Sequence, residues 1–241
     1  MRNQLTPKQI ERILSIIESK LPSDGKVVCL SLTGSRSYGW ASEKSDWDIR
    51  GIFSAKNHWD WVHYSYRDTE IKAVIDISLY RLQSFLSQSF PSISFEFFRE
   101  MANPIYLDQK FDYKGLMSFC YPQFCHEPEY DLIMFEKFGN VKNALQAYRI
   151  LMIQINFLKT NIIETNIFEL NQKFKFKILS SLRKKYQEGK PLTLKEREEI
   201  KKDLEKLLNE FRETKNKKVT EIPIETQRWK AWQDKMKKLY T

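Results

Sequence analysis

The chain has 241 residues, which is enough for one large domain or two small ones around a buried core. A hydrophobic fraction of 41% and an aromatic fraction of 14% argue against a disordered chain. No apolar run approaches the ~20 residues that a membrane-spanning helix needs, and the N-terminus lacks the apolar segment of a signal peptide. Three scattered cysteines do not suggest a disulfide framework. We therefore expect a cytoplasmic protein with reduced cysteines and no membrane partner.

The formal net charge of +9 is unevenly distributed along the chain. Residues 170–241 hold 21 Lys and Arg against 11 Asp and Glu, whereas the preceding residues hold 19 against 20. A basic lobe beside a nearly neutral one favours a phosphate-bearing partner such as RNA. The alternative is a solvated helix face that needs positive charge only for solubility. Both interpretations stay open at this stage.

The N-terminal part is predicted to contain both helices and strands. Thr6 and Pro7 are typical of a helix start, and apolar residues at helical spacing continue the helix to about residue 21. Runs of β-branched and apolar residues predict three strands, over 27–33, 46–54 and 69–80. Residues 36–45 are expected to be a loop or the first turn of a helix.

The third predicted strand has two different faces. Alternation places Val74, Asp76, Ser78 and Tyr80 on one face and Ile75, Ile77 and Leu79 on the other. After this strand, helices are predicted over 81–90 and 96–101.

Prolines and glycines interrupt residues 103–140, so we place a domain boundary there. Beyond it, helices are predicted over 141–159, over 170–187 and from Thr193, which forms a capping box with Glu196. The basic tail, 214–241, is expected to be either a docked helix or a loose end. The predicted fold class is α+β: a small mixed β-sheet flanked by helices over 1–108, then a mainly α-helical domain over 109–241.

Gly34 and Ser35 directly follow the first predicted strand. A glycine lets the backbone approach a phosphate closely. The serine hydroxyl and the amides at a following helix start can bind phosphate oxygens. Gly-Ser pairs also form ordinary turns, so this pair alone indicates little.

Asp46, Asp48 and Asp76 are the candidate metal ligands. Spacing of i, i+2 on a strand puts Asp46 and Asp48 on one face, where Mg2+ would relieve their repulsion and join them to substrate phosphates. Asp76 interrupts an apolar run, where a carboxylate without a partner is costly to bury. The alternatives are two solvated aspartates on a polar edge strand, and a salt-bridged or strand-edge Asp76.

These features combine in one stretch, in which Gly-Ser-Arg-Ser-Tyr-Gly (34–39) precedes Ser-Asp-Trp-Asp-Ile-Arg-Gly (45–51). It resembles the DNA polymerase β superfamily of nucleotidyltransferases, where Gly-Ser precedes Asp-x-Asp and a third carboxylate lies on a later strand. The fuller motif is similar to a group of predicted nucleotidyltransferases, some of them RNA-ligase-associated (RlaP-like) proteins of RNA repair. The similarity is specific over 28–54 and looser over 74–100.

The resemblance implies an N-terminal catalytic domain that transfers a nucleoside monophosphate from a nucleoside triphosphate, expected to be ATP, to a hydroxyl group. Gly34 and Ser35 would hold the triphosphate, and Asp46, Asp48 and Asp76 would hold two Mg2+ ions, or Mn2+ in their place. One ion would activate the acceptor hydroxyl and the other would neutralise the leaving pyrophosphate. Asp76 would help to deprotonate the acceptor or hold the metal that does so. RNA is the expected acceptor, through the basic C-terminal domain.

Basic residues near these motifs are further candidates for nucleotide binding. Arg36 is one, whereas Arg50 is expected to form an ion pair with a neighbouring aspartate. Lys142, Gln146 and Arg149 share one helix face, where Lys142 and Arg149 could reach the triphosphate. A solvated face is the slightly preferred interpretation of this helix.

Aromatic residues are frequent in the stretch 55–68, which contains Trp59, Trp61, Tyr64 and Tyr66. A hydrophobic loop packed on the core is the preferred interpretation, and a base-stacking surface is the alternative. The three histidines, His58, His63 and His126, are expected to have structural or surface roles.

Other classes of function remain alternatives. The acceptor would be a protein or small molecule in an antitoxin-like or antibiotic-modifying relative, and a degenerate relative would only bind nucleotide or RNA. A plain interaction module would leave the aspartates solvated. Because all three carboxylates are retained, an enzyme is favoured. The sequence leaves open the acceptor, the nucleotide and the oligomeric state.

Overall fold

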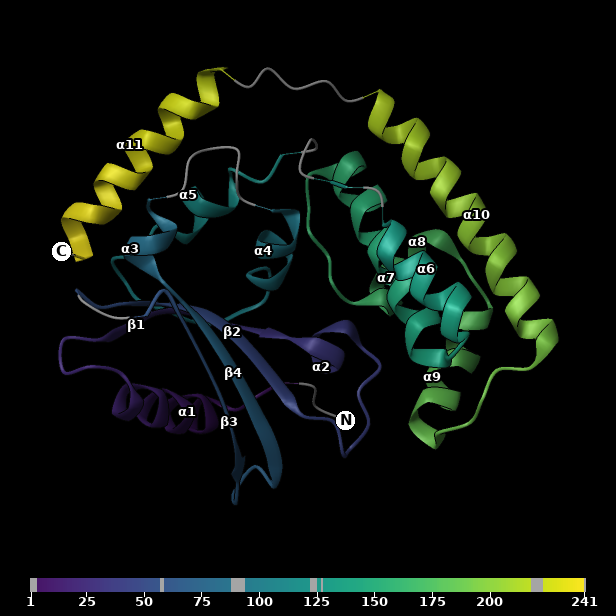
Figure 1. Ribbon diagram of the computed structural model, residues 1–241, viewed down its shortest axis with the longest axis horizontal. Helices are drawn as coiled ribbons and strands as arrows, with labels where there is room; N and C mark the ends of the chain where they lie inside the picture. Colours follow the sequence, from purple (N-terminus) through teal and green to yellow (C-terminus); the bar gives the residue numbers. More distant parts are fainter. Residues whose placement is uncertain are drawn as a thin grey trace. The chain divides into compact units, whose positions relative to one another are not determined.

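The computed structural model describes residues 4–56, 59–87, 94–121, 125–126, 128–217 and 223–240. The chain forms two compact units (Figure 1). The sheet unit comprises Met1–Ser37, Glu43–Cys120 and Glu221–Thr241, and the helical unit comprises Tyr38–Ser42 and Tyr121–Thr220. The domain limits predicted from the sequence, 1–108 and 109–241, stay a prediction.

The sheet unit contains a five-stranded sheet in the order β3-β4-β2-β1-β5. The strands are β1 (Lys26–Thr33), β2 (Trp47–Ser54), β3 (Trp61–Asp68), β4 (Ala73–Arg81) and β5 (Pro104–Leu107). Strands β2 and β4 are parallel, and the other neighbouring pairs are antiparallel. The predicted small mixed sheet with flanking helices is therefore confirmed.

One face of the sheet packs on helix α1 (Pro7–Lys20), which begins at the predicted N-cap Thr6, where the structure also shows a capping box with Gln9. Ile13 and Ile17 of α1 are fully buried in this core. They share it with the inward face of β4, formed by Ile75, Ile77 and Leu79. Because side chains alternate across a strand, the polar residues of β4 lie on the opposite face, as the sequence predicts.

Short helices and the C-terminal helix complete the sheet unit: α3 (Leu82–Phe85), α4 (Phe95–Glu100), α5 (Tyr113–Met117) and α11 (Pro223–Tyr240). Figure 1 shows α1 on one side of the sheet and α3 and α4 on the other. Trp229 and Trp232 of α11 are buried against Phe85 and Phe119. The basic tail therefore ends in a docked helix.

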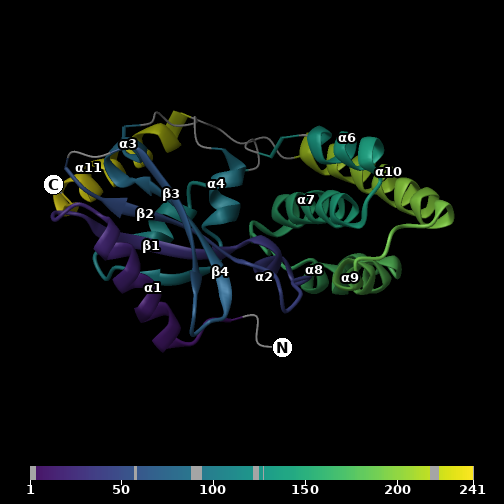
Figure 2. The same ribbon diagram turned by 60° about the horizontal axis from the view of Figure 1, so that its bottom comes forward.

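The helical unit contains α6 (Glu129–Phe138), α7 (Val141–Thr160), α8 (Ile167–Phe174), α9 (Ile178–Glu188) and α10 (Leu194–Asn216). Helix α7 is the central one, because it contacts the other four, and Figure 2 shows it between α6 and α10 on one side and α8 and α9 on the other. Helix α10 begins with the predicted capping box at Thr193. Within the described ranges, no helix is long and apolar enough to cross a membrane.

Three sequence predictions need correction. The stretch 55–68 is not a loop, because it contains strand β3. The helix predicted over 170–187 is two helices, since Lys175 adopts a left-handed φ of +64° and ends α8. Helix α3 ends at Phe85, and residues 88–90 of the longer predicted helix lie outside the described ranges.

Candidate active site

Two of the three candidate carboxylates lie opposite one another on adjacent parallel strands. In the β2–β4 register, Asp48 pairs with Asp76. Both side chains are half-buried and project from the sheet face opposite α1. Asp46 is exposed and directly precedes β2. The fold thus brings together residues that are far apart in sequence, at the same level of the sheet.

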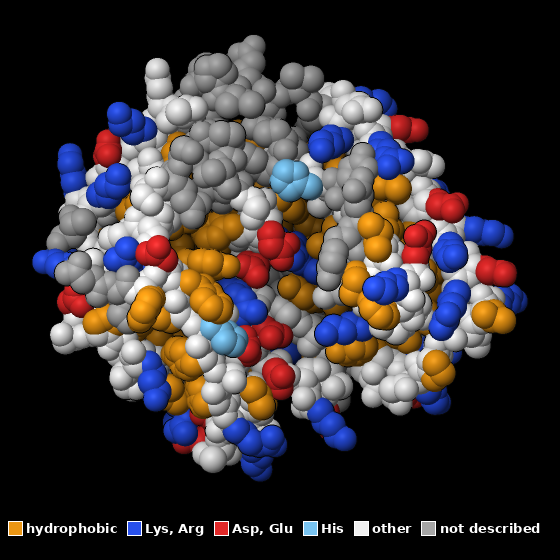
Figure 3. Space-filling model, in the orientation of Figure 1, with side chains coloured by type: hydrophobic (Ala, Val, Ile, Leu, Met, Phe, Trp, Pro, Cys, Tyr) orange, Lys and Arg blue, Asp and Glu red, His pale blue; other side chains and the backbone are white. Residues whose placement is uncertain are grey.

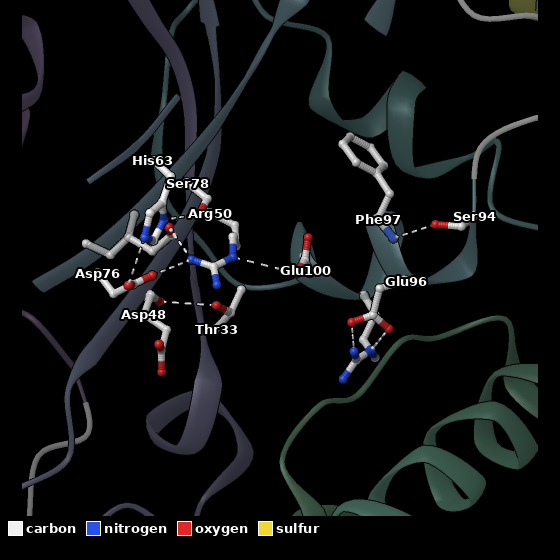
Figure 4. A network of polar contacts seen from close by, with 12 residues as sticks. Thr33, Asp48, Arg50, His63, Asp76, Ser78, Ser94, Glu96, Phe97 and Glu100 are labelled. Carbon is white, nitrogen blue, oxygen red and sulfur yellow. Dashed lines mark hydrogen bonds and ion pairs between the residues drawn. The ribbon is translucent and has the colours of Figure 1, made fainter. Parts of the chain in front are cut away.

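Arg50 links two carboxylates, those of Asp76 and Glu100, as Figure 4 shows. Its Nη1 donates to Asp76 Oδ1 at 2.9 Å, and its Nε lies 3.7 Å from Glu100 Oε1. Burial opposes charge on the guanidinium, but the hydrogen bond to Asp76 and the charges of Glu100 and Asp48 raise the pKa of Arg50. The ion pair predicted for Arg50 is therefore confirmed. It also accounts for a carboxylate at position 76 among apolar neighbours.

His63 also lies beside Asp76, as Figure 4 shows. Its Nε2 is 3.7 Å from Asp76 Oδ2, and its Nδ1 is 3.0 Å from Ser78 Oγ. The β3–β4 register pairs His63 with Ser78, so strand pairing delivers the imidazole to this face. His63 belongs to the site's polar network, beyond the structural or surface role predicted for it.

Glu100 is a site residue that the sequence interpretation missed. It ends helix α4, whose first turn is capped by Ser94. Burial raises the pKa of Glu100, although Arg50 and Arg99 act in the opposite direction. A Glu in the phenylalanine-rich segment 95–100 was the available signal, because an acidic residue in a buried helix needs a partner.

Gly34 is in close contact with Asp48. A side chain is excluded there, since an added Cβ would lie 1.7 Å from Asp48 Oδ2 and the backbone φ is +67°. Gly34 begins the short helix α2 (Gly34–Tyr38), and Ser35 follows it half-buried. The Gly-Ser pair thus lies directly beside one candidate metal ligand.

Arg36 supports the approach to β2. Its Nε donates to the carbonyl of Asp46 at 3.1 Å, its Nη2 donates to the carbonyl of Ser45 at 2.5 Å, and its guanidinium lies 4.1 Å from the centre of the Trp47 ring. Burial lowers the pKa of Arg36, while Asp46 and Asp48 act to raise it. These contacts hold the backbone that carries Asp46, whereas a role of Arg36 in nucleotide binding stays a prediction.

The donor chemistry of Asp46, Asp48 and Asp76 suits a hard divalent cation, since all three offer carboxylate oxygens from one region of the sheet. Among the described residues, however, no group of three His, Cys, Asp or Glu side chains is gathered closely enough to hold a metal ion. Asp76 directs one oxygen to Arg50, and Asp46 is exposed. Joint ligation by all three carboxylates therefore requires these side chains to move closer together.

Lys142 and Arg149 both belong to helix α7 of the helical unit. Lys142 is exposed, but Arg149 is buried, so a solvated face was the wrong interpretation for Arg149. Its Nε donates to Gln146 at 2.8 Å, and its guanidinium lies 3.8 Å from the centre of the Tyr38 ring. Its Nη1 is buried without a hydrogen-bond partner among the described residues. Nucleotide binding by Lys142 and Arg149 stays a prediction.

The four aromatic residues of the stretch 55–68 divide between two environments. Tyr64 and Tyr66 are half-buried and pack on the core beside α1. Trp59 and Trp61 are 77% and 50% exposed. Packing on the core is therefore correct for the tyrosines and wrong for the tryptophans. The period of two within β3 was the overlooked signal.

A comparison with protein-family models finds a match. Residues 7–88 match the RNA repair pathway DNA polymerase beta family (RlaP), and this range is 82 of the 241 residues. It contains α1, the Gly-Ser pair and all three candidate carboxylates. The resemblance seen in the sequence motif is thereby confirmed over this range. No curated protein matches the chain.

Proposed function

We propose that this chain, whose residues 7–88 match the RNA repair pathway DNA polymerase beta family, transfers a nucleoside monophosphate from a nucleoside triphosphate to a hydroxyl group of RNA. The observation that carries the proposal is the register pairing of Asp48 with Asp76, beside a Gly34 that can bear no side chain. Polymerase β-like nucleotidyltransferases generally use divalent metals, and we propose Mg2+ with ATP as the nucleotide.

We propose separate roles in binding and catalysis for the residues of the sheet unit. Gly34 and Ser35 bind the triphosphate, and Asp46, Asp48 and Asp76 hold the metal, which supplies Lewis-acid stabilisation of the phosphate charge when bound. The acceptor oxygen forms a bond to the α-phosphorus, the bond from that phosphorus to the bridging oxygen breaks, and pyrophosphate leaves. Asp76, once freed from Arg50, would accept the hydroxyl proton. Arg50 then keeps Glu100 as its ionic partner.

The helical unit supports RNA as the acceptor through local charge. Residues 167–190, over α8 and α9, hold seven Lys and Arg against two Glu. Helix α10 holds seven of each sign, and Figure 3 shows the two signs interspersed over it. The basic excess is therefore concentrated on a short segment, as backbone binding favours. The unpartnered Nη1 of buried Arg149 supports keeping Arg149, with Lys142, as a proposed ligand of phosphate.

The test is incubation of the full chain with each α-labelled nucleoside triphosphate, Mg2+ or Mn2+, and a mixed RNA pool. We expect label on RNA with the wild type and none with Asp48→Asn or Asp76→Asn. Asp234→Asn is the matched control, because Asp234 is an exposed carboxylate on α11, outside the site. Label on protein or on a small molecule would mean that the acceptor is of that class and not RNA. No Mg2+-dependent binding of any nucleotide would refute the proposed function.

A further inference from the structure

The edge strand β3 extends the candidate active-site face beyond Asp76. Its burial alternates, so Trp61, His63, Ser65 and Arg67 are exposed while the intervening residues face the α1 core. Register pairs Ser65 with Asp76, His63 with Ser78 and Trp61 with Tyr80. The exposed side chains of β3 therefore lie on the face that carries Asp48 and Asp76.

Trp61 and His63 form a flat aromatic pair on this face. Their ring centres are 5.5 Å apart and their planes differ by 9°, which is a stacked arrangement. The His63 ring is fixed through Ser78 and Asp76. Half of Trp61 remains exposed. An aromatic face that is partly open to solvent suits stacking by a nucleobase.

The position of the aromatic pair relative to the Gly-Ser motif indicates that the pair would contact the acceptor and not the nucleoside triphosphate. Strand β2 separates β1, which leads into Gly34 and Ser35, from β4 and β3. In phosphoryl transfer the attacking and leaving oxygens lie roughly in line on opposite sides of the phosphorus. With the triphosphate on the β1 side, the attacking hydroxyl must approach from the side of β4 and β3. The Trp61–His63 pair lies on that side.

The distance between the aromatic pair and Asp76 is consistent with a nucleic-acid strand. At ~3.3 Å per residue, the Trp61 position is roughly 13 Å along the strand from the level of Asp76, so the stacked base would be the last or next to last of the acceptor. Arg67 is exposed on the same face and forms no ion pair within the described part of the chain. Register pairs Arg67 with Val74, on the far side of Asp76 from Trp61, so Arg67 lies beyond the path from Asp76 to the aromatic pair.

We infer that the Trp61–His63 pair is a stacking platform for a base at or next to the 3′ end of a single-stranded RNA acceptor. The inference rests on the proposed function, because the side of approach follows from binding of the triphosphate at Gly34 and Ser35. It deepens that function by naming single-stranded RNA as the acceptor and Trp61 as a positioning residue.

The test measures binding of a labelled single-stranded oligoribonucleotide of about ten nucleotides to the full chain by fluorescence anisotropy with Mg2+. Matched probes lack the base at the 3′-terminal, penultimate or 5′-terminal position. We expect loss of one of the two 3′ bases to weaken wild-type binding about tenfold, as one base–aromatic stack allows. Trp61→Leu should weaken binding of the intact probe equally, and loss of that base should then have no further effect.

Two variants separate stacking from other contributions. Trp61→Phe should restore most of the affinity, because it keeps a ring. Trp59→Leu should leave affinity unchanged, because Trp59 is an exposed tryptophan outside β3. Equal loss in Trp59→Leu, independent losses from Trp61→Leu and the missing base, or no binding of the RNA by the wild type would each overturn the inference.

Transfer measurements keep the inference separate from the proposed function. With RNA as acceptor, Trp61→Leu should raise the KM for RNA about tenfold and leave the KM for the nucleoside triphosphate unchanged. If transfer to RNA proceeds with identical KM values in wild type and Trp61→Leu, the platform is wrong and the transferase stands. If Asp48→Asn still labels RNA, the proposed site fails independently of Trp61.

Discussion

Gly34 shows how one missing side chain can shape the site. A Cβ at this position would meet Asp48 Oδ2 at 1.7 Å, which no rotation of the glycine backbone can relieve without moving the carboxylate or α2. The requirement is thus twofold, for a positive φ of +67° and for open space beside Asp48. The sequence motif includes a glycine at this position, and the geometry explains why a side chain does not fit there.

Gly34→Ala should therefore lower the transfer activity strongly and the stability of the fold only slightly. We expect the left-handed backbone to cost ~1 kcal/mol, and displacement of Asp48 to lower nucleotide transfer by roughly 100-fold. Gly189→Ala is the matched control, because Gly189 has the same φ of +67° and nothing within 4 Å of an added Cβ. Urea unfolding should show similar losses of stability for both variants. Equal transfer activity in the two variants would show that Asp48 tolerates the displacement.

The candidate site was predictable where chemistry is local and hidden where it depends on strand pairing. Strand alternation sufficed to place Asp76 opposite the buried residues of β4. The partners of Asp76 come from register: His63 arrives from β3, and Arg50 arrives from β2, where the sequence pointed only to some neighbouring aspartate. Glu100 comes from a helix with no motif of its own. Sequence periodicity specifies which face a residue takes, but not which strand lies beside it.

At the scale of elements, the β3–β4 hairpin is anchored to α1 by a buried carboxylate. Asp68 accepts from Arg12 Nε at 2.8 Å and from the backbone amides of Glu70 and Ile71 at 2.9 and 2.8 Å. Burial acts to raise the pKa of Asp68, but these hydrogen bonds outweigh it and lower the pKa. The carboxylate thus stabilises the turn of the hairpin and connects it to helix α1.

This anchor predicts a pH dependence of stability. Because the pKa of Asp68 is lower in the folded chain than its unfolded value of about 3.9, its contribution is present above about pH 4 and is lost as pH falls. Asp68→Asn should reduce the acid-side slope of the free energy of unfolding, and Asp68→Ala should cost about 1–3 kcal/mol at neutral pH. Urea unfolding between neutral and acidic pH measures both. An unchanged slope in Asp68→Asn would mean that other carboxylates dominate.

Elements were predicted best where local signals are strong. Helix α10 has a capping box at Thr193 and an apolar stripe, and both are present. Strand β3 escaped prediction because its aromatic residues fall on both faces, which obscures alternation of apolar and polar residues. The break between α8 and α9 escaped it because Lys175, not glycine, takes the left-handed position that ends α8.

At the scale of the whole molecule, the C-terminal helix packs against segments of the sheet unit that lie much earlier in the chain. Trp232 of α11 is buried among aromatic rings, and its Nε1 donates to the carbonyl of Asp112 at 3.2 Å. Gln233 donates to the carbonyl of Leu86 at 2.9 Å, and the Tyr240 hydroxyl donates to Asp108 at 2.8 Å. These contacts join the last helix to segments more than a hundred residues earlier.

Trp232→Ala should accordingly destabilise the sheet unit by about 3–5 kcal/mol, since it opens a cavity among packed rings. Lys230→Ala is the control on the same helix, because Lys230 is exposed and its loss should change stability by less than about 0.5 kcal/mol. Urea unfolding followed by circular dichroism measures the difference. Equal stability of the two variants would show that α11 contributes little to the fold.

The uneven charge of the helical unit predicts which lysines make RNA binding depend on salt concentration. Lys175, Lys177 and Lys184 are exposed and form no ion pairs within the described residues, so each could release a counterion on binding phosphate. Replacing all three with alanine should weaken RNA binding for every sequence and reduce the salt slope by about 1 for each lysine that contacts phosphate. Removing Lys201, Lys202 and Lys206 from the neutral helix α10 removes the same charge from another place. If RNA follows α8 and α9, only the first set changes the slope strongly; equal changes would mean that net charge alone attracts the RNA.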